Sequence, residues 1–252
     1  MRWKARGQAA GWHMIASIAV ASTAAFLVFG VWYPHPYDVL AGGSDLFRLV
    51  VTVDVVMGPL LTFVVFDRSK PKRELWRDLL VIVFLQLAAL GYGLRTVYLA
   101  RPVYLVHEVD RFRVVSAPDV DPVDLAQATE SFRELPRYGV RVIGVRPSRD
   151  GAETLRALES ALAGKDLAVT PQRWQELDDG NRQEIRQKAS SIAFLRSRAG
   201  PSLPALERVI RDSGVPSEHL IAMPLVGRQD DWCVVIDGRD VRILAYLPIN
   251  LF

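Results

Sequence analysis

The stretch from Leu46 to Phe66 reads LFRLVVTVDVVMGPLLTFVVF and decides the fold of the chain. It is an almost unbroken apolar run of about twenty residues, the length that spans a bilayer core of roughly 30 Å when the helix rises about 1.5 Å per residue. We therefore predict a transmembrane helix over residues 46–66.

Two features distinguish this segment from a simple membrane anchor. Asp54 lies inside the apolar run, and Gly58 and Pro59 follow one helical turn later. A carboxylate at the centre of a bilayer costs about 2.5–3.5 kcal/mol on insertion scales, so it is normally paired or functional. Pro59 has no N–H and therefore frees the carbonyl of Val55. Two interpretations of Asp54 follow: it pairs with a neighbouring helix and holds a bundle together, or it helps to bind a partner.

Composition divides the chain into two parts. Of its 252 residues, 50% are hydrophobic and 23% are charged, and the two kinds are segregated. The long apolar runs precede residue 100, and most of the charge follows it. We predict a three-helix transmembrane bundle over 1–100, with helices at about 13–32, 46–66 and 79–99. A soluble, periplasmic α+β domain over 101–252 follows it.

The first apolar run, 13–32, follows a short basic arm and resembles a signal peptide. The run continues past the small residues that would form a cleavage site, which indicates an uncleaved helix. Ser17, Ala21 and Ala25 recur at every fourth position of this run. Such a stripe of small residues lets another helix approach closely, so we regard it as a candidate contact surface.

The third apolar run, 79–99, carries Gln86 and two glycines among its aliphatic residues. Arg95 lies near its end, where its side chain has two alternatives. It can extend to the membrane interface, or it can reach back toward Asp54 on an antiparallel neighbour.

The soluble part alternates short strand and helix patterns. Strands are expected at Val103–Val109, Phe112–Ser116, Val140–Val145, Leu220–Val226, Trp232–Ile236 and Val241–Leu247. Helices are expected from Asp121 along the stripe Leu125, Ala128, Phe132 and Leu135, over Leu155–Leu162, around Trp174, from a capping box at Asn181 through Arg198, and over Ser202–Ser213.

A search for chemistry finds no phosphate-binding loop, nucleophile elbow or zinc-protease motif. Cys233 is the only cysteine, so no intramolecular disulfide can form. Pairing it with His219 would give a thiol–imidazole site, but a lone cysteine in the apolar stretch WCVVI is more typical of a core thiol. We expect no catalytic residues, no metal and no cofactor, and hence no enzyme. The net charge of +3 lies largely beside the membrane segments, which indicates contact with the lipid bilayer and no nucleic-acid partner.

Several motifs together resemble a known family. They are WYPHPY at 32–37, GGSDLF at 42–47, VDVVMGPLLT at 53–62, ARPV at 100–103, EVDRFRVV at 108–115 and YLPINL at 246–251. The chain is similar to the type IV pilin accessory proteins of the TfpX/TfpZ group. The resemblance implies an inner-membrane, chaperone-like protein that supports the stability, assembly or surface export of type IV pilin subunits, its expected partners. It supplies no catalytic residues. The alternative is a membrane-anchored periplasmic sensor or envelope scaffold that binds another ligand.

The distribution of Lys and Arg predicts the orientation in the membrane. The N-terminal arm and the 67–77 loop are rich in these residues, whereas the 34–45 loop has none. Basic loops remain in the cytoplasm, so the N-terminus is expected there and residues after about 100 in the periplasm of the bacterial cell.

Reporter fusions test this orientation. Fusions after residues 40 and 120 should be active only with a periplasmic reporter, and fusions near Lys70 only with a cytoplasmic one. Cytoplasmic activity after residue 120 would contradict the three-span topology.

Overall fold

The computed structural model describes residues 2–67, 69–228 and 232–252, and the chain forms two compact units. The first unit contains the chain up to Asp38 and Gly42–Arg101. The second contains Val39–Ala41 and Pro102–Phe252. Three long helices in the first unit and a mixed sheet with helices in the second confirm the predicted fold class.

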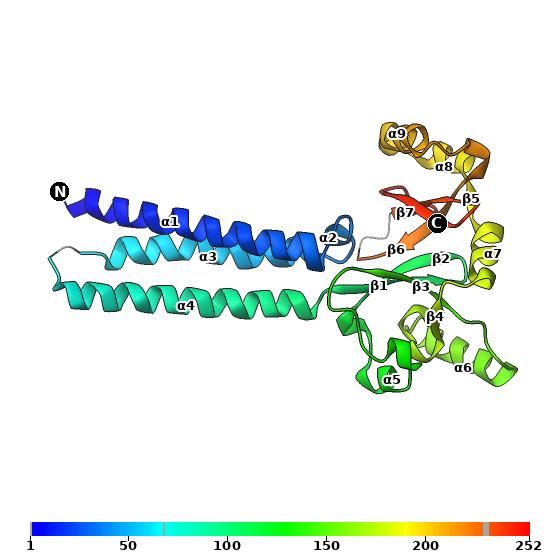
Figure 1. The fold of residues 1–252 in the computed structure, drawn as a ribbon, viewed down its shortest axis with the longest axis horizontal. Helices are drawn as coiled ribbons and strands as arrows, with labels where there is room; N and C mark the ends of the chain where they lie inside the picture. Colours follow the sequence, from blue (N-terminus) through cyan, green and yellow to red (C-terminus); the bar gives the residue numbers. More distant parts are fainter. Residues whose placement is uncertain (1, 68, 229–231) are drawn as a thin grey trace. The chain divides into compact units, whose positions relative to one another are not determined.

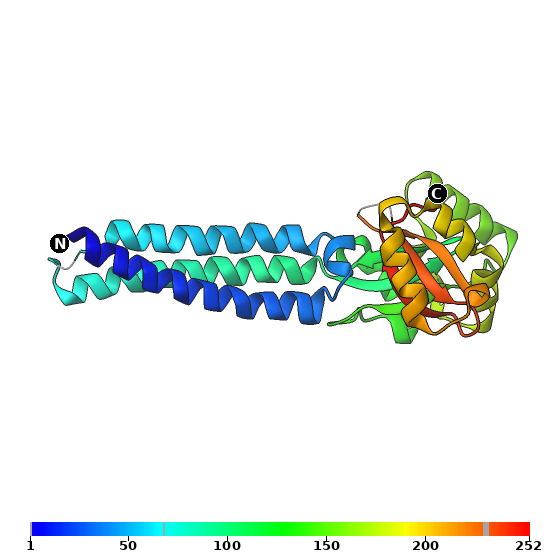
Figure 2. The ribbon, with the colours of Figure 1, turned by 90° about the horizontal axis from the view of Figure 1, so that it is seen from above.

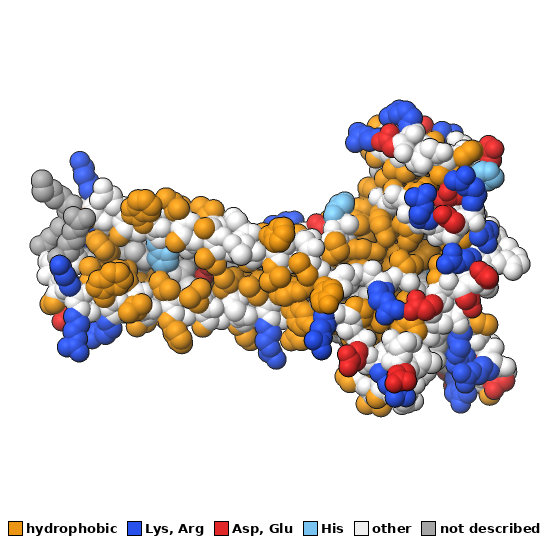
Figure 3. Space-filling view, in the orientation of Figure 1, with side chains coloured by type: hydrophobic (Ala, Val, Ile, Leu, Met, Phe, Trp, Pro, Cys, Tyr) orange, Lys and Arg blue, Asp and Glu red, His pale blue; other side chains and the backbone are white. Residues whose placement is uncertain are grey.

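The first unit is built from three long helices that run beside one another (Figures 1 and 2). They are α1 (Arg2–Leu27), which continues into the π-helical turn η1 (Val28–Trp32), α3 (Gly43–Val65) and α4 (Lys72–Leu99), and the short α2 (Tyr37–Leu40) follows η1. All three are long and apolar enough to cross a membrane. Hydrophobic side chains dominate their surface in Figure 3, as contact with lipid requires.

Helix α3 occupies the central position in this bundle. It packs against both α1 and α4, whereas α1 and α4 make few close backbone approaches to each other along their length. Pro59 lies inside α3, and the helix nevertheless continues to Val65. The side chain of Tyr33 donates a hydrogen bond to the carbonyl of Val97 at 2.9 Å, which links the end of η1 to α4.

The second unit contains a mixed eight-stranded sheet. Its strands are β1 (Pro102–Glu108), β2 (Arg111–Ser116), β3 (Arg141–Val145), β4 (Trp174–Glu176), β5 (Ser190–Ser191), β6 (Leu220–Val226), β7 (Trp232–Asp237) and β8 (Arg242–Leu247). The order is β4-β3-β1-β2-β6-β7-β8, with β5 paired to β6. The pairs β1–β3 and β2–β6 are parallel, and all other pairs are antiparallel.

Helices surround this sheet. The α-helices are α5 (Pro122–Ala126), α6 (Gly151–Leu162), α7 (Asp179–Lys188), α8 (Ile192–Arg198) and α9 (Leu203–Ser213). Short 3-10 turns are η2 (Ala117–Asp119), η3 (Glu130–Phe132), η4 (Leu167–Val169), η5 (Pro171–Arg173), η6 (Gly200–Ser202) and η7 (Ser217–His219).

Two hydrophobic clusters stabilise the second unit. In the first, the rings of Tyr104 and Trp174 lie 4.8 Å apart, and the indole N–H of Trp174 donates to the carbonyl of Ala168 at 2.8 Å. The second cluster lies between α8, α9 and β6–β8 and includes Cys233. Burial raises the pKa of the Cys233 thiol to about 12, and His219 is exposed, so the thiol is a core group and not a nucleophile at neutral pH.

Residues 39–41 belong to the second unit although they precede α3 in the chain. Leu40 is fully buried, and its carbonyl accepts the N–H of Arg228 at 2.7 Å. A side chain at Gly227 would meet this carbonyl at 2.8 Å, so only glycine allows so close an approach.

Two of the expected helices are shorter than the sequence pattern indicates. The helix predicted from Asp121 to Leu135 ends at Ala126, and Ala128 and Phe132 enter the core from irregular chain. At the end of α5 the N–H groups of Gln127 and Ala128 bond to carbonyls three residues back, at 3.1 Å each, so the last turn tightens and the α-helical pattern stops.

The helix predicted through Arg198 is divided in two. Ala189 is extended, and β5 pairs with β6, so the chain leaves the helix for one short strand. Ser191 then caps α8 by accepting the N–H of Phe194. The first half is capped by Asp178, whose carboxylate accepts the N–H of Asn181 at 2.8 Å, and the predicted capping role of Asn181 is wrong.

Candidate functional site

One face of α3 carries a stripe of polar and small residues. Asp54, Gly58 and Thr62 recur at every fourth position, so they lie on the same side of the helix. Thr62 and Gly58 are buried, and Asp54 is partly buried. This stripe contacts both neighbouring helices, α4 through Gln86 and α1 through His13.

Gln86 of α4 reaches across to α3. Its Nε2 donates to the backbone carbonyl of Asp54 at 3.0 Å and lies 3.3 Å from the carboxylate oxygen Oδ1 of the same residue. A Cβ placed on Gly58 would overlap the amide group of Gln86. Glycine at position 58 therefore makes room for this crossing side chain, one residue before Pro59.

On its other side, the stripe contacts α1. Nδ1 of His13 and Oγ1 of Thr62 are 2.5 Å apart, with the donor set by the imidazole tautomer. Ser17 lies one turn further along α1. Two side-chain hydrogen bonds, one toward each neighbour, thus hold α3 between α1 and α4.

Because α1 and α4 do not close against each other, a groove of about 400 Å³ lies between them. Asp54 and Thr62 of α3 contribute polar groups to its lining. The remaining lining residues are Ala9, His13, Ala16, Ser17 and Val20 from α1, and Trp76, Leu79, Val83, Gln86 and Leu87 from α4. Within the described part of the chain, the Oε1 atom of Gln86 is buried without a hydrogen-bond donor. The groove is therefore largely apolar, with the partly exposed carboxylate of Asp54 as a hydrogen-bond acceptor in its lining.

The small-residue stripe of α1 is used inside the bundle. Ser17 and Ala21 are buried, Ala25 is half-buried, and the buried positions continue to Ala24 and Val28. Since α1 packs along α3, this stripe lets the two helices approach closely. Only Ser17 of the predicted stripe also lines the groove.

Arg95 is exposed on α4 and lies more than two turns beyond Gln86. In the part of the chain that the structure describes, no ion pair joins Arg95 to Asp54, whose partner is Gln86. Close packing nearer to Arg95 comes from Gly93, where a side chain would meet Val50.

Sequence analysis did not assign a role to His13, Thr62 or Gln86. A signal was present for Gln86, since it is the one amide in an apolar run, and an amide in hydrocarbon needs a partner. His13 stands four residues before Ser17, in line with the small-residue stripe, and this spacing is the signal that could have revealed it.

The loop that joins α3 to α4 is fixed to the start of α1. Arg6 forms an ion pair with Asp67 at 3.1 Å. Hydrogen bonds from the backbone and hydroxyl of Ser69, followed by the contact with Arg6, lower the pKa of Asp67 to about 2. The carboxylate is therefore ionised under all ordinary conditions.

The fold and the groove define a class of protein: a small membrane bundle with a largely apolar groove that has an acid in its lining, followed by a separate α+β unit. The Fimbrial assembly protein FimB family model matches residues 1–42. The chain is 35% identical over 245 residues to the "Fimbrial assembly protein, serogroup I" of Dichelobacter nodosus, covering 96% of this chain and 94% of that protein.

The corresponding protein of serogroup E1 from the same organism is 33% identical over 244 residues, with the same coverage of 96% and 94%. The protein of serogroups C1 and C2 is 43% identical over 118 residues, which are 47% of this chain and 90% of that protein. No solved structure matches the chain. The chain belongs to the FimB family of fimbrial assembly proteins.

The packing around Gly58 leads to a prediction about stability. Changing Gly58 to Ala should displace the amide of Gln86 and lower the thermal midpoint of the full chain in detergent by several degrees, because overpacking costs about 1–3 kcal/mol. The matched control is Gly91→Ala in α4, where an added methyl group meets nothing within 4 Å. That variant should unfold at the same temperature as the native chain or higher, and equal midpoints for the two variants would contradict the packing role of Gly58.

Proposed function

We propose that this protein is a non-enzymatic fimbrial assembly factor of the bacterial inner membrane that holds the apolar helix of a type IV pilin subunit before assembly. The groove between α1 and α4 is the observation that carries the proposal. Family membership supports it, since the related Dichelobacter nodosus proteins are named fimbrial assembly proteins. The motifs shared with the TfpX/TfpZ group of pilin accessory proteins favour a pilin as the partner.

The walls of the groove suit a helix. Val20 on α1 and Val83 and Leu87 on α4 present aliphatic side chains at membrane depth. A single apolar helix would bury these surfaces by close packing, the main force between helices in lipid. The groove occupies a lipid-facing bundle, so its occupant must itself be a membrane segment.

The acid in the groove lining restricts which side chains an occupying helix would carry at this depth. The carboxylate oxygens of Asp54 are hydrogen-bond acceptors in the groove lining, and lipid tails offer no donor to them. A subunit helix with a hydroxyl, amide or amine group at this depth would satisfy them. The expected contribution is modest, because such contacts in membranes average below about 2 kcal/mol.

We infer a binding role instead of catalysis. Among the described residues that line the groove, His13 and Thr62 pair an imidazole with a hydroxyl, but Thr62 is only 2% exposed, so we assign this contact to the packing of α1 on α3. With the N-terminus in the cytoplasm, the second unit would lie in the periplasm, on the side where the soluble part of a membrane-anchored pilin is expected. Contacts of the groove and of this unit with one subunit would then reinforce each other.

Substitutions of Asp54 test the proposal. In Asp54→Asn the remaining Oδ1 still accepts from Gln86, so the bundle should persist while the charge offered to a partner is lost. We expect surface pilin to fall several-fold relative to total pilin, at an unchanged level of the assembly protein. Asp45→Asn is the control, because Asp45 lies on the same helix with a side chain that is 75% exposed.

The opposite pattern separates the two interpretations of Asp54. If Asp54→Asn assembles normal fimbriae and Asp54→Leu only lowers the amount of the assembly protein, the carboxylate serves the bundle alone. Native behaviour of both variants would leave Asp54 without either role.

A further inference from the structure

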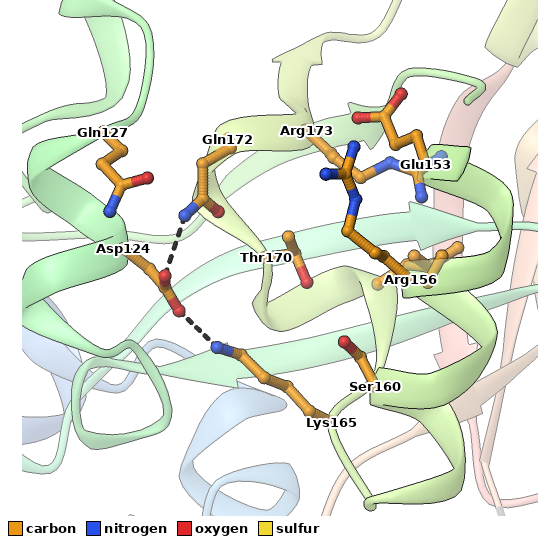
Figure 4. A pocket seen from close by; sticks show the side chains of 11 residues that line it. Asp124, Gln127, Glu153, Arg156, Ser160, Lys165, Thr170, Gln172 and Arg173 are labelled. Carbon is orange, nitrogen blue, oxygen red and sulfur yellow. Dashed lines mark hydrogen bonds and ion pairs between the residues drawn. The ribbon is translucent and has the colours of Figure 1, made fainter. Parts of the chain in front are cut away.

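A separate pocket lies wholly within the second unit. It has a volume of about 430 Å³ and is formed by α5, α6 and the segment that carries η4 and η5 (Figure 4). Charged and amide side chains line it, and those that matter here are Asp124, Glu153, Arg156, Lys165, Gln172 and Arg173. No chemistry described above uses this pocket.

Both acidic groups of the pocket are already neutralised. Asp124 forms an ion pair with Lys165 and accepts the amide N–H of Gln172 at 2.8 Å, as Figure 4 shows. Glu153 binds the guanidinium of Arg146 through two hydrogen bonds, at 2.7 and 3.0 Å. Hydrogen bonding and charge from Arg146 lower the pKa of Glu153 to about 2, so it is ionised and committed to that partner.

The two remaining cations, Arg173 and Arg156, form no ion pair among the described residues. Arg173 is only 5% exposed, and one nitrogen, Nη2, donates to the carbonyl of Arg146 and the hydroxyl of Ser148. Its Nε and Nη1 atoms have no acceptor among the described residues. Arg156 is exposed on α6, and the described part of the chain gives it no ion pair. Burial lowers the pKa of Arg173, and Glu153, which is hydrogen-bonded to Arg146, opposes this lowering without forming an ion pair with Arg173. An incompletely compensated buried charge is costly, which favours binding of an anion here.

A neighbouring acceptor restricts the anion further. The Oε1 atom of Gln172 is buried and has no donor within the described residues, while its amide nitrogen is used by Asp124. The pocket thus has one exposed guanidinium, that of Arg156, beside two buried groups, the guanidinium of Arg173 and the Oε1 atom of Gln172, whose hydrogen-bonding capacity the described residues leave unmet. A ligand that carries a carboxylate next to an N–H group meets both requirements, and a peptide provides this pair of groups.

We propose that the pocket between α5, α6 and η5 binds a peptide carboxylate, with Arg173 and Arg156 contacting the carboxylate and Gln172 accepting the adjacent N–H. The carboxylate comes either from a chain end or from an acidic side chain. This pocket and the groove in the membrane bundle share no lining residue. The proposed binding of a carboxylate here can therefore be disproved while the proposed function of the groove still holds, and the reverse is also true.

Binding is tested on the full chain in detergent by thermal unfolding at constant ionic strength. The probes are N-acetylglycine, which mimics a chain end, and N-acetylaspartic acid amide, which mimics an acidic side chain. A saturable rise in Tm of about 2–4 °C is expected with at least one of them, since a ligand that binds only the folded chain stabilises it. The larger rise identifies the source of the carboxylate. Neutral N-acetylglycinamide should give none.

Variants link the effect to the pocket. Arg173→Gln should abolish the rise, and Arg156→Gln should reduce it by half or more while leaving the fold intact, because Arg156 is exposed. Arg208→Gln, at an exposed position on α9, is the control and should respond like the native chain.

Three results would overturn the proposal. The first is no rise with either probe in the native chain. The second is an undiminished rise in Arg156→Gln, which decides the matter even if Arg173→Gln does not fold. The third is an equal rise in Tm with sulfate. Sulfate has no N–H group, so this result would show that the Oε1 atom of Gln172 does not contribute to the choice of ligand.

Discussion

The contact of Gln86 with Asp54 across Gly58 is the interaction on which the membrane bundle depends. It gives the N–H group of Gln86 and one carboxylate oxygen of Asp54 a partner that hydrocarbon cannot supply, and it requires a glycine where the amide crosses α3. Gln86 donates to the backbone carbonyl of Asp54 as well as to its side chain, so one amide contacts both the backbone and the acid of α3.

Holding α3 between its neighbours has a structural consequence. Gln86 fixes α4 on one side, and the contact of His13 with Thr62 fixes α1 on the other, so α1 and α4 remain apart. The space between them is the groove, and its acceptors come from the same residues that hold the bundle. Lipid can fill an apolar groove without difficulty, but it cannot donate a hydrogen bond. This difference is what would favour a protein helix over lipid as the occupant.

Sequence alone predicted what depends on local composition. Hydropathy identified the three spans, and Asp54 stood out because an acid is rare in such a run. The partner of Asp54 was not predictable, because the register between antiparallel helices is set by packing: Gly93 seats against Val50, and that register brings Gln86 level with Asp54 and leaves Arg95 exposed. In the second unit the six predicted strands formed within one residue of their expected bounds, but β5 was not expected, and the helix expected around Trp174 is strand β4, which pairs with β3. The burial of Arg173 was equally unpredictable, since nothing in the sequence distinguishes a buried arginine from an exposed one.

The central claim is that a subunit helix occupies the groove, and site-specific photo-crosslinking in cells tests it most directly. Leu87 lines the groove, whereas Leu85 does not, and the two positions point to opposite faces of α4 because they are two residues apart. Both side chains are similarly exposed, at 55% and 57%, so a photoreactive residue at either position meets the surroundings of the helix equally well. The account predicts a crosslink to pilin from position 87 and none from position 85. Equal crosslinking from both positions, or none from 87 in cells that assemble fimbriae, would contradict it.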